Sequence, residues 1–561
     1  MLTRVSTISL RLIHPNCISE YQVSTTINRS AGPVVRRFFG MSSTKSSKRP
    51  VGRKFVIACD GTWQNSDMGV DTSPFSPPKT QIPTNVTRIV RALNHHDEKG
   101  ITQIAFYQRG VGTDNLEDKL VGGLTGNDIG EHIREAYAFL ANNFNPETQK
   151  DLDDETKPRD EIVVLGFSRG AYTARAIASL ISDVGLLTKM GMESFWAIFG
   201  DWMKQDVEGE QSKWFLATYP EVAKKFQAAN GKKIGFTDKE YRETLINAGL
   251  TRWGMPVRAV GVWDTVGALG IPLPWNSKNV KPFSFVNTKV ARAVQHAFHA
   301  LAIDEHRNLF TPTLWEQPNE GSGQTVNLKV LKQCWFPGPH SNVGGSYPDA
   351  GIANITLAWM ISQLEDTDGG ILSFNPDYLD FIQDLNSKFY EKEKEAIRPW
   401  GFGKLYDSSM VTDAITMAQA MKPIIRTPGR YHRVSTEDGK QTSIPLKGTG
   451  ECIHRCVRVR IDGGGKGPEE NTDDTVLEKA FTLIKKAAGF HPDNTEEAKF
   501  YNSPGLKNFT LVEPSVVKSA KDPAGSAAGV YWKGKDGLGD LPEDGLGKTE
   551  IRLLKRSVGV K

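Results

Sequence analysis

The sequence predicts an α/β fold, with a mostly parallel sheet covered by helices on both faces. Two observations carry this prediction. Short apolar runs rich in β-branched residues alternate with amphipathic helical stretches from Lys54 onward, which is the pattern of parallel strands joined by crossover helices. One of these runs, Ile162 to Phe167, turns through Gly166 and Gly170 into an alanine-rich helix. This order of strand, turn and helix is that of a nucleophile elbow, so the predicted class is α/β-hydrolase-like.

The composition is that of a globular protein. The 561 residues are 39% hydrophobic and 24% charged, values that leave no case for wholesale disorder. We expect three parts: a basic segment over residues 1–50, a catalytic domain over 51–350, and a C-terminal accessory region over 351–561 that packs on the hydrolase. The sequence has no apolar run of about 18 residues, so it predicts no transmembrane segment.

Residues 1–50 hold eight lysines and arginines against one acid, Glu20. This basic, Ser- and Thr-rich composition is typical of a mitochondrial transit peptide, and a disordered tail or a true start at Met41 would account for it as well. The remaining chain is slightly acidic and has no basic stripe interleaved with aromatic residues, which argues against nucleic acid as a partner. The five cysteines are dispersed, as in a reducing compartment. We predict an intracellular, cytoplasmic protein, with mitochondria as the alternative.

The alternation of strands and helices continues along the chain. Asn85 is predicted to cap the first helix. Gly- and Pro-rich surface loops are predicted at 463–465 and 522–546. The predicted strands are 54–59, 102–107, 162–167, 257–263 and 328–336, and the predicted helices are 86–94, 128–143, from the elbow to about 182, 357–364 and 378–395.

Ser168 lies at the centre of the elbow. A tight turn between strand and helix forces backbones together, and glycines at 166 and 170 avoid the clash because they lack a Cβ. Ser168 is then exposed at the tip, beside the positive end of the helix dipole. The simpler interpretation is a serine that caps the helix in an ordinary βα turn.

Two later strands end in residues that suit a catalytic triad. Asp264 follows the strand 257–263, and His340 follows the strand 328–336 on a Gly-rich loop. The order Ser168, Asp264, His340 is that of α/β-hydrolases and differs from the other serine hydrolase folds. These residue types predict a nucleophile, the acid that orients the base, and the base.

The oxyanion of such a reaction needs backbone donors. One is predicted to be the N–H of Arg169, directly after the nucleophile, and the other to come from Gly61 or Thr62 on the loop after the first strand. The segment Asp60-Gly61 is equally compatible with a plain βα turn.

An insertion over 189–255 separates the elbow helix from the next strand. It is rich in aromatic residues, among them Trp196, Trp202, Trp214 and Trp253. The insertion is either a cap whose aromatic residues offer an apolar wall to an acyl chain, or an ordinary helical subdomain.

Other chemistry-bearing residues suit weaker interpretations. The glycine clusters 110–112 and 122–126 lack the dinucleotide-binding spacing. Cys452-Ile-His454-Arg-Cys456 lacks zinc spacing and a second ligand pair, so neither a cofactor nor a metal is predicted. On a segment predicted to be helical, the spacing of His296 and His299 would place both on one face and could suggest a metal, but no carboxylate-rich partner stands out. With His306 and Asp304 they are therefore expected to line the core or a pocket. His454 and Asp349 are weaker substitutes for the base and the acid.

Five ordered blocks resemble one known family, the catalytic domain of type VI secretion phospholipase effectors (Tle-like), whose relatives also occur widely in fungi. The resemblance covers roughly residues 52–350 and rests on Asp60-Gly-Thr-Trp63, Gly110-Val-Gly-Thr113, Gly166-Phe-Ser-Arg-Gly-Ala-Tyr-Thr-Ala-Arg175, Gly261-Val-Trp-Asp-Thr-Val-Gly267 and His340-Ser-Asn-Val-Gly-Gly345. It implies that Ser168 is the nucleophile, Asp264 the acid and His340 the base. The family more often has an acid at the position of Asn342 and a glycine at that of Ser346.

The predicted reaction is acyl transfer to water, and the resemblance implies lipid or phospholipid esters as substrates, with peripheral membrane contact. An elbow alone serves esterases, thioesterases and peptidases alike. The alternatives are therefore a thioesterase or amidase, and a hydrolase-fold scaffold that binds lipid or protein without catalysis.

Overall fold

A computed structural model of the chain describes residues 52–61, 70–71, 79–80, 82–110, 126–145, 159–204, 212–266, 288–318, 327–406, 424–434, 441–469, 501–513 and 529–557. The basic segment 1–50 lies outside these residues, as do Thr62, most of the 110–113 block and the glycine cluster at 122–125. None of the described helices is long and apolar enough to cross a membrane.

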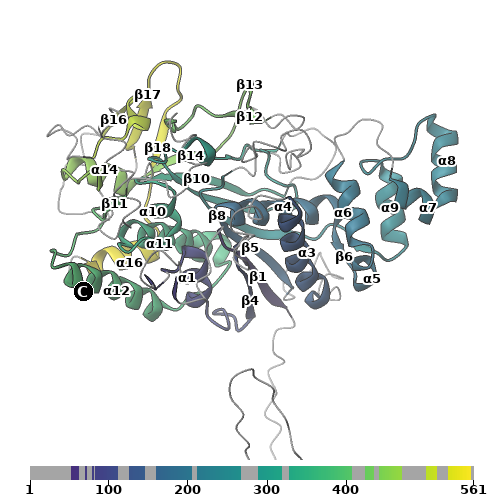
Figure 1. Ribbon diagram of the computed structural model, residues 1–561, viewed down its shortest axis with the longest axis horizontal. Coiled ribbons are helices and arrows are strands. Elements are labelled where there is room, and N and C mark those ends of the chain that lie inside the picture. Colours follow the sequence, from purple (N-terminus) through teal and green to yellow (C-terminus); the bar gives the residue numbers. More distant parts are fainter. Residues whose placement is uncertain are drawn as a thin grey trace, which may run out of the picture. The chain divides into compact units, whose positions relative to one another are not determined.

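The framework is a ten-stranded sheet (Figure 1). Every pairing from β4 to β18 is parallel, and only β17, which pairs with β18 and with the edge strand β16, runs in the opposite direction. This confirms the predicted mostly parallel α/β class. In sheet order the strands are β16 (Phe509–Val512), β17 (Tyr531–Gly534), β18 (Leu541–Asp544), β14 (Glu451–His454), β10 (Val330–Phe336), β9 (His296–Ala302), β8 (Val257–Trp263), β5 (Glu161–Phe167), β1 (Arg53–Cys59) and β4 (Thr102–Gln108).

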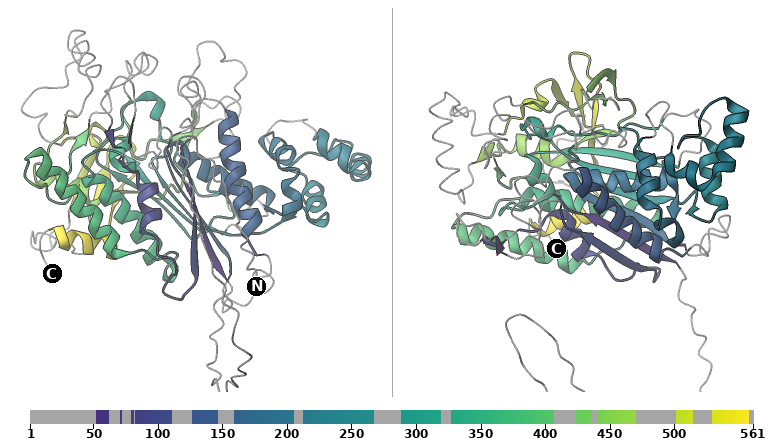
Figure 2. Two further views of the ribbon diagram at one scale, coloured as in Figure 1. Left: turned by 60° about the horizontal axis from the view of Figure 1, so that its bottom comes forward. Right: turned by 45° about the vertical axis from the view of Figure 1, so that its right-hand side comes forward.

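Helices cover both faces of this sheet (Figure 2). One face packs against α1 (Asn85–Ala92), α10 (His340–Gly344), α11 (Gly351–Asp366), α12 (Pro376–Glu393), α14 (Arg455–Asp462) and α16 (Lys548–Ser557). The other packs against α3 (Gly126–Asn143) and α4 (Arg169–Val184). The hydrophobic core on this side continues beyond the sheet into the insertion helices α5 (Lys189–Met192), α6 (Phe195–Met203), α7 (Lys213–Thr218), α8 (Pro220–Asn230) and α9 (Lys239–Asn247).

Short elements complete the described chain. They are the strand pairs β2 (Val70–Asp71) with β3 (Lys79–Thr80), β6 (Leu186–Leu187) with β7 (Thr251–Arg252), β11 (Leu405–Tyr406) with β15 (Pro468–Glu469) and β12 (His432–Val434) with β13 (Gln441–Pro445), and the 3₁₀ turns η3 (Asn308–Phe310), η4 (Thr367–Gly369) and η6 (Pro504–Leu506).

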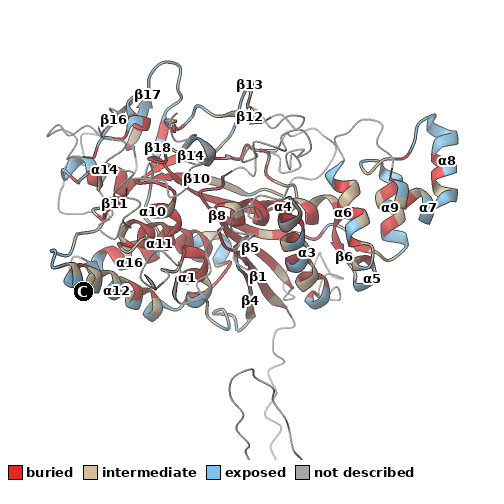
Figure 3. Cartoon of the chain, viewed as in Figure 1, coloured by how far each residue is buried: buried red, intermediate tan, exposed pale blue. Residues whose placement is uncertain are grey.

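Burial explains why the central strands have continuous apolar sequences. Successive side chains of a strand point to opposite faces: Phe55 and Ile57 of β1 enter the core beneath α3 and α4, whereas Val56 and Ala58 enter the core beneath α1 and α11. Because helices cover both faces, both sets are buried (Figure 3). Fully buried parallel strands favour such runs over a polar–apolar alternation.

Three sequence predictions about local structure were wrong. The segment that carries His296 and His299 is strand β9, not a helix, because every residue from His296 to Ala302 is buried between two neighbouring strands. The stretch 522–546 contains β17 and β18, which pair at the sheet edge. Thr84 rather than Asn85 caps α1, and its side chain accepts the Thr87 N–H.

The insertion joins the sheet at the amino ends of the parallel strands, opposite their carboxyl ends. Helix α4 starts after β5 and runs back along the sheet; β6 at the start of the insertion then pairs with β7 at its end, just before β8 begins. Trp202 and Phe215 are buried in its core, whereas Trp196 is 47% exposed. The point of attachment gives no support to a cap over the carboxyl edge, and that role remains a prediction.

Candidate active site

Ser168 has the strained backbone expected of a nucleophile elbow, but the residue is buried, at 8% exposure, where the sequence predicts an exposed tip. It stands between β5 and α4 with φ 58° and ψ −124°, and a positive φ is uncommon for any residue other than glycine. Its N–H donates to the carbonyl of Trp263 at 3.1 Å, which fixes the turn to the end of the neighbouring strand β8.

The elbow glycines are required by close approach of backbones. A Cβ on Gly166 would lie 2.4 Å from the carbonyl oxygen of Gly170, and a Cβ on Gly170 would lie 2.2 Å from that of Cys59 at the end of β1. Neither contact can be relieved by a rotamer change, because the atoms that clash belong to the backbone.

We therefore expect Gly170→Ala to lower the free energy of unfolding by about 1–3 kcal/mol or more. Gly200→Ala is the matched control, because Gly200 lies inside α6 with no atom within 4 Å of the added Cβ, and it should stabilise by about 0.5–1 kcal/mol. Denaturant unfolding of both variants measures the difference; equal effects would mean that the turn is not as tight as described.

Asp264 and His340 meet at the carboxyl edge of the sheet. Asp264 follows β8, and His340 follows β10 as the first residue of α10. The imidazole Nδ1 lies 2.5 Å from Oδ2 of Asp264, and both side chains are buried, at 0% and 4% exposure. In the described part of the chain Nε2 of His340 has no hydrogen-bond partner, so this nitrogen is available to a hydroxyl.

The imidazole also lies beside the elbow. The ring of Phe167, the residue before Ser168, is centred 4.6 Å from that of His340, and the ring of Phe310 lies 4.9 Å away on another side. Gly344 of α10 allows this approach, because a Cβ there would lie 1.9 Å from Cε2 of Phe167. The fold thus gathers Ser168, Asp264 and His340 at one edge of the sheet.

A residue that the sequence did not reveal completes this group. Arg426, itself fully buried, lies 2.6 Å through Nη1 from Oδ1 of Asp264 and 3.1 Å through Nη2 from Oδ2. Burial alone would raise the pKa of Asp264, but the guanidinium of Arg426 and the imidazole of His340 outweigh it and hold that pKa well below its usual range. Arg426 belongs to no motif and could not have been found from spacing.

Gly61 lies against Ser168, the position that an oxyanion loop would need. A Cβ on Gly61 would stand 3.2 Å from Cβ of Ser168. Its N–H, however, donates to Oδ1 of Asp60 at 2.7 Å. Arg169 is the first residue of α4, and first-turn N–H groups point out of a helix N-terminus. The oxyanion roles of Gly61, Thr62 and Arg169 remain predictions.

Asp60 proves more than a turn residue. Its buried carboxylate accepts hydrogen bonds from Thr84 at 2.8 Å, Thr87 at 3.2 Å and Tyr107 at 2.7 Å in addition to Gly61. Burial raises the pKa of Asp60 to about 6 in spite of these donors. This carboxylate therefore ties the loop beside Ser168 to α1 and β4.

The alternative histidines and acids have other partners. Both nitrogens of His299 are hydrogen-bonded, to Gln333 and to the N–H of Thr265, and burial lowers its pKa to about 3. His296 is hydrogen-bonded to the carbonyl of Arg258, and His306 to that of Ile424. His454 pairs with Glu550. Asp349 accepts a hydrogen bond from Tyr390, and Asp304 accepts one from the N–H of Gly338. Each of these side chains has a role in holding the fold together.

Asp544 brings a carboxylate close to two thiols, those of Cys334 and Cys452. It already accepts from Lys332 at 3.0 Å and from Trp359 at 2.7 Å. The ammonium group therefore neutralises the only acid of this cluster within the described residues.

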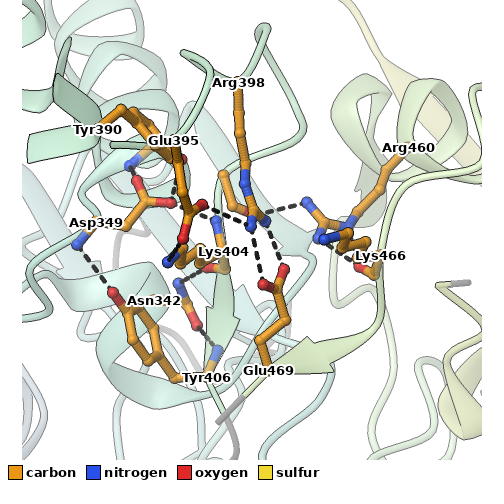
Figure 4. Close-up of polar contacts among 12 residues, drawn as sticks. Asn342, Asp349, Tyr390, Glu395, Arg398, Lys404, Tyr406, Arg460, Lys466 and Glu469 are labelled. Carbon is orange, nitrogen blue, oxygen red and sulfur yellow. Dashed lines mark hydrogen bonds and ion pairs between the residues drawn. The ribbon is translucent and has the colours of Figure 1, made fainter. Parts of the chain in front are cut away.

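Asn342 stands where the family more often has an acid. Its side-chain amide makes two hydrogen bonds to the backbone of the segment that contains Lys404 and Tyr406. Its Nδ2 donates to the carbonyl of Lys404 at 2.8 Å, and its Oδ1 accepts from the N–H of Tyr406 at 3.0 Å. Figure 4 shows this pair beside the contacts of Asp349 and Tyr390. A carboxylate could accept but not donate, so the amide is needed for the segment that packs against α10.

Asn342→Asp is accordingly expected to lower the free energy of unfolding by about 1–3 kcal/mol, because it leaves the buried Lys404 carbonyl opposite an oxygen. Asn247→Asp, at an exposed position in α9, should change it by less than about 0.5 kcal/mol. Denaturant titrations of the two variants decide this, and equal values would rule out the bidentate role.

The family model described as "T6SS, Phospholipase effector Tle1-like, catalytic domain" matches residues 53–363. The chain belongs to this family. The match confirms the predicted resemblance. An uncharacterized protein of Saccharomyces cerevisiae (strain ATCC 204508 / S288c), YEL023C, is 25% identical over 287 residues, in line with a fungal-type member of the Tle1-like family.

That alignment covers 48% of this chain and 33% of the yeast protein, so the chain matches about a third of the length of its relative. Among solved structures, the crystal structure of an uncharacterized protein from Pseudomonas aeruginosa matches with a TM-score of 0.33 and 16% identity over 63% of this chain and 52% of that one. The structure of the Tle1 effector bound to the VgrG spike from the Type 6 secretion system matches with a TM-score of 0.25 and 19% identity over 53% of this chain and 52% of that one.

Proposed function

We propose that the protein is a serine ester hydrolase that cleaves lipid or phospholipid esters through Ser168, His340 and Asp264. The observation that supports this best is the buried Asp264–His340 pair, which lies beside a strained Ser168 at the carboxyl edge of the sheet. The Tle1-like family is named for phospholipase effectors. This favours lipid esters over other acyl compounds as substrates.

The geometry suits a two-step acyl transfer. As Oγ of Ser168 attacks the ester carbonyl, Nε2 of His340 takes its proton, and Asp264 holds Nδ1–H and stabilises the imidazolium. His340 then gives the proton to the leaving alcohol, and an acyl-enzyme remains. A water molecule, deprotonated by His340, releases the acid and restores Ser168. Each oxyanion donor contributes about 3–4 kcal/mol to such a reaction.

A fluorophosphonate probe tests this proposal directly. The purified protein is labelled, digested, and the adduct located by mass spectrometry; we expect a single adduct on the peptide that contains Ser168. Hydrolysis is then followed with diacylphospholipids, 4-nitrophenyl esters, a thioester and an anilide. An adduct on another serine would overturn the nucleophile, and a folded protein that neither reacts nor hydrolyses any substrate would favour the scaffold.

The pH dependence should report His340. Burial lowers the pKa of His340 below its ordinary value, although the Asp264 carboxylate raises it. The base must be neutral, so kcat/KM should fall as the pH drops through this pKa, with a midpoint under the ordinary value of about 6.5. A kcat/KM profile on a soluble ester measures the midpoint, and one above 7 would contradict the assignment.

A further inference from the structure

Arg426 comes from a part of the chain beyond the family match, which ends at residue 363. Its fork spans both oxygens of Asp264, and the same guanidinium donates to the carbonyl of Ala302 at 2.8 Å and to that of Phe310. Together with the N–H of Ala302 at 3.0 Å and His340, this gives the carboxylate a full set of donors. A bidentate guanidinium fixes the plane of a carboxylate as well as its charge.

The segment that carries Arg426 is itself fixed. The N–H of Ile424 donates to the carbonyl of His306 at 2.9 Å, and Nδ1 of His306 lies 3.0 Å from the carbonyl of Ile424. Gly505 packs against the other side, since a Cβ there would lie 2.2 Å from the carbonyl oxygen of Arg426. The guanidinium is therefore placed by contacts on two sides, one from the loop after β9 and one from the chain near η6.

The charges around the triad give Arg426 an electrostatic effect. Arg426, Asp264 and a neutral His340 together carry no net charge. A proton on His340 would therefore leave an uncompensated buried cation. Without Arg426 the same pair carries one negative charge, and the proton would neutralise it. Among the described residues, Arg307 also lowers the pKa of His340 and Glu305 raises it. His299 and Tyr431 are further titratable groups near Asp264. Glu305 and Arg307 form a 2.8 Å ion pair.

We propose that Arg426 is a positioning residue of the triad, which fixes the Asp264 carboxylate and keeps His340 neutral at the pH of catalysis. This inference rests on the proposed function. In the described structure, the C-terminal region thus contributes to the chemistry of a site whose nucleophile, acid and base all lie within the family match.

The test compares Arg426→Met, Arg426→Lys and Arg460→Met with the wild type. Arg460 is the matched control: it is a fully buried arginine of the same region whose guanidinium binds the backbone carbonyls of Gly401, Gly403 and Lys466 (Figure 4). The probe is 4-nitrophenyl butyrate, followed as kcat/KM between about pH 5 and 9. Thermal unfolding is recorded for every variant.

We expect Arg426→Met to move the acid limb of the profile upward by about one pH unit or more and to lower kcat/KM at pH 7 by at least about tenfold. Arg426→Lys keeps the charge and loses the fork, so its limb should stay near that of the wild type while kcat falls. Arg460→Met should lose stability without moving the limb.

Two results would overturn the inference: an acid limb of Arg426→Met that coincides with the wild type, or a limb that Arg460→Met moves as far. Should Arg426→Met fail to unfold cooperatively, the lysine variant decides the matter, because a limb displaced in spite of the retained charge contradicts the proposal. Failure of the proposed function would look different, since the wild type itself would then hydrolyse no ester.

Discussion

Replacing Ser168 with alanine is expected to lower kcat/KM for ester hydrolysis by about 10⁴- to 10⁶-fold. Loss of a serine nucleophile removes the covalent route entirely, and what remains comes from binding and oxyanion stabilisation. The stability of the protein should hardly change, because alanine adds no atom to the turn. The measurements are steady-state kinetics on a soluble ester and denaturant unfolding.

Ser443→Ala is the control for this variant, because Ser443 is an exposed serine of β13. It should hydrolyse the ester as the wild type does. Retention of more than about a hundredth of the activity in folded Ser168→Ala would place the nucleophile elsewhere.

Asp264→Asn combines a large loss of activity with a large loss of stability. The amide no longer fixes the imidazole tautomer, which costs about 10⁴-fold in kcat in a comparable triad. It also leaves the fully buried Arg426 without its counterion, and an unpaired buried charge costs about 3–5 kcal/mol. Kinetics and denaturant unfolding measure the two effects separately.

The double variant Asp264→Asn with Arg426→Met discriminates between these causes. Removal of both charges should restore part of the stability. The sum of the losses of unfolding free energy in the two single variants should therefore exceed the loss in the double variant. Strictly additive losses would mean that the two side chains do not interact. Asp536→Asn, at an exposed position in a turn, is the control and should stay within about 0.5 kcal/mol of the wild type.

The central strands and the elbow could be predicted because their physical requirements leave marks in the sequence. Strands buried on both faces need continuous apolar runs, and the turn around Ser168 needs glycines at fixed positions. Strand β9 has the same burial but carries His296 and His299 three residues apart, a spacing that resembles one face of a helix. Their role as buried hydrogen-bonding residues within a strand depends on β8 and β10, which the local sequence does not contain.

Arg426 and the edge strands show the other limit. A single arginine far from the motifs acquires its role only when the fold places its guanidinium against Asp264. Strands β17 and β18 span four residues each in a Gly-rich stretch, and such short edge strands have little periodicity to detect. The sequence predicts Asn85 as a cap, but its amide instead donates to the carbonyls of Val343 and Ala353 and so ties α1 to α10 and α11.

The continuation of the sheet past the family match has a practical consequence. A fragment cut at residue 363 would lose β14 and β18, and the backbone N–H and C=O groups on that side of β10 would become a bare sheet edge. Bare edges recruit strands from other molecules and promote aggregation. Exchange of residues 53–363 between relatives would therefore transfer the candidate triad but leave behind the strands that cover this edge of the sheet.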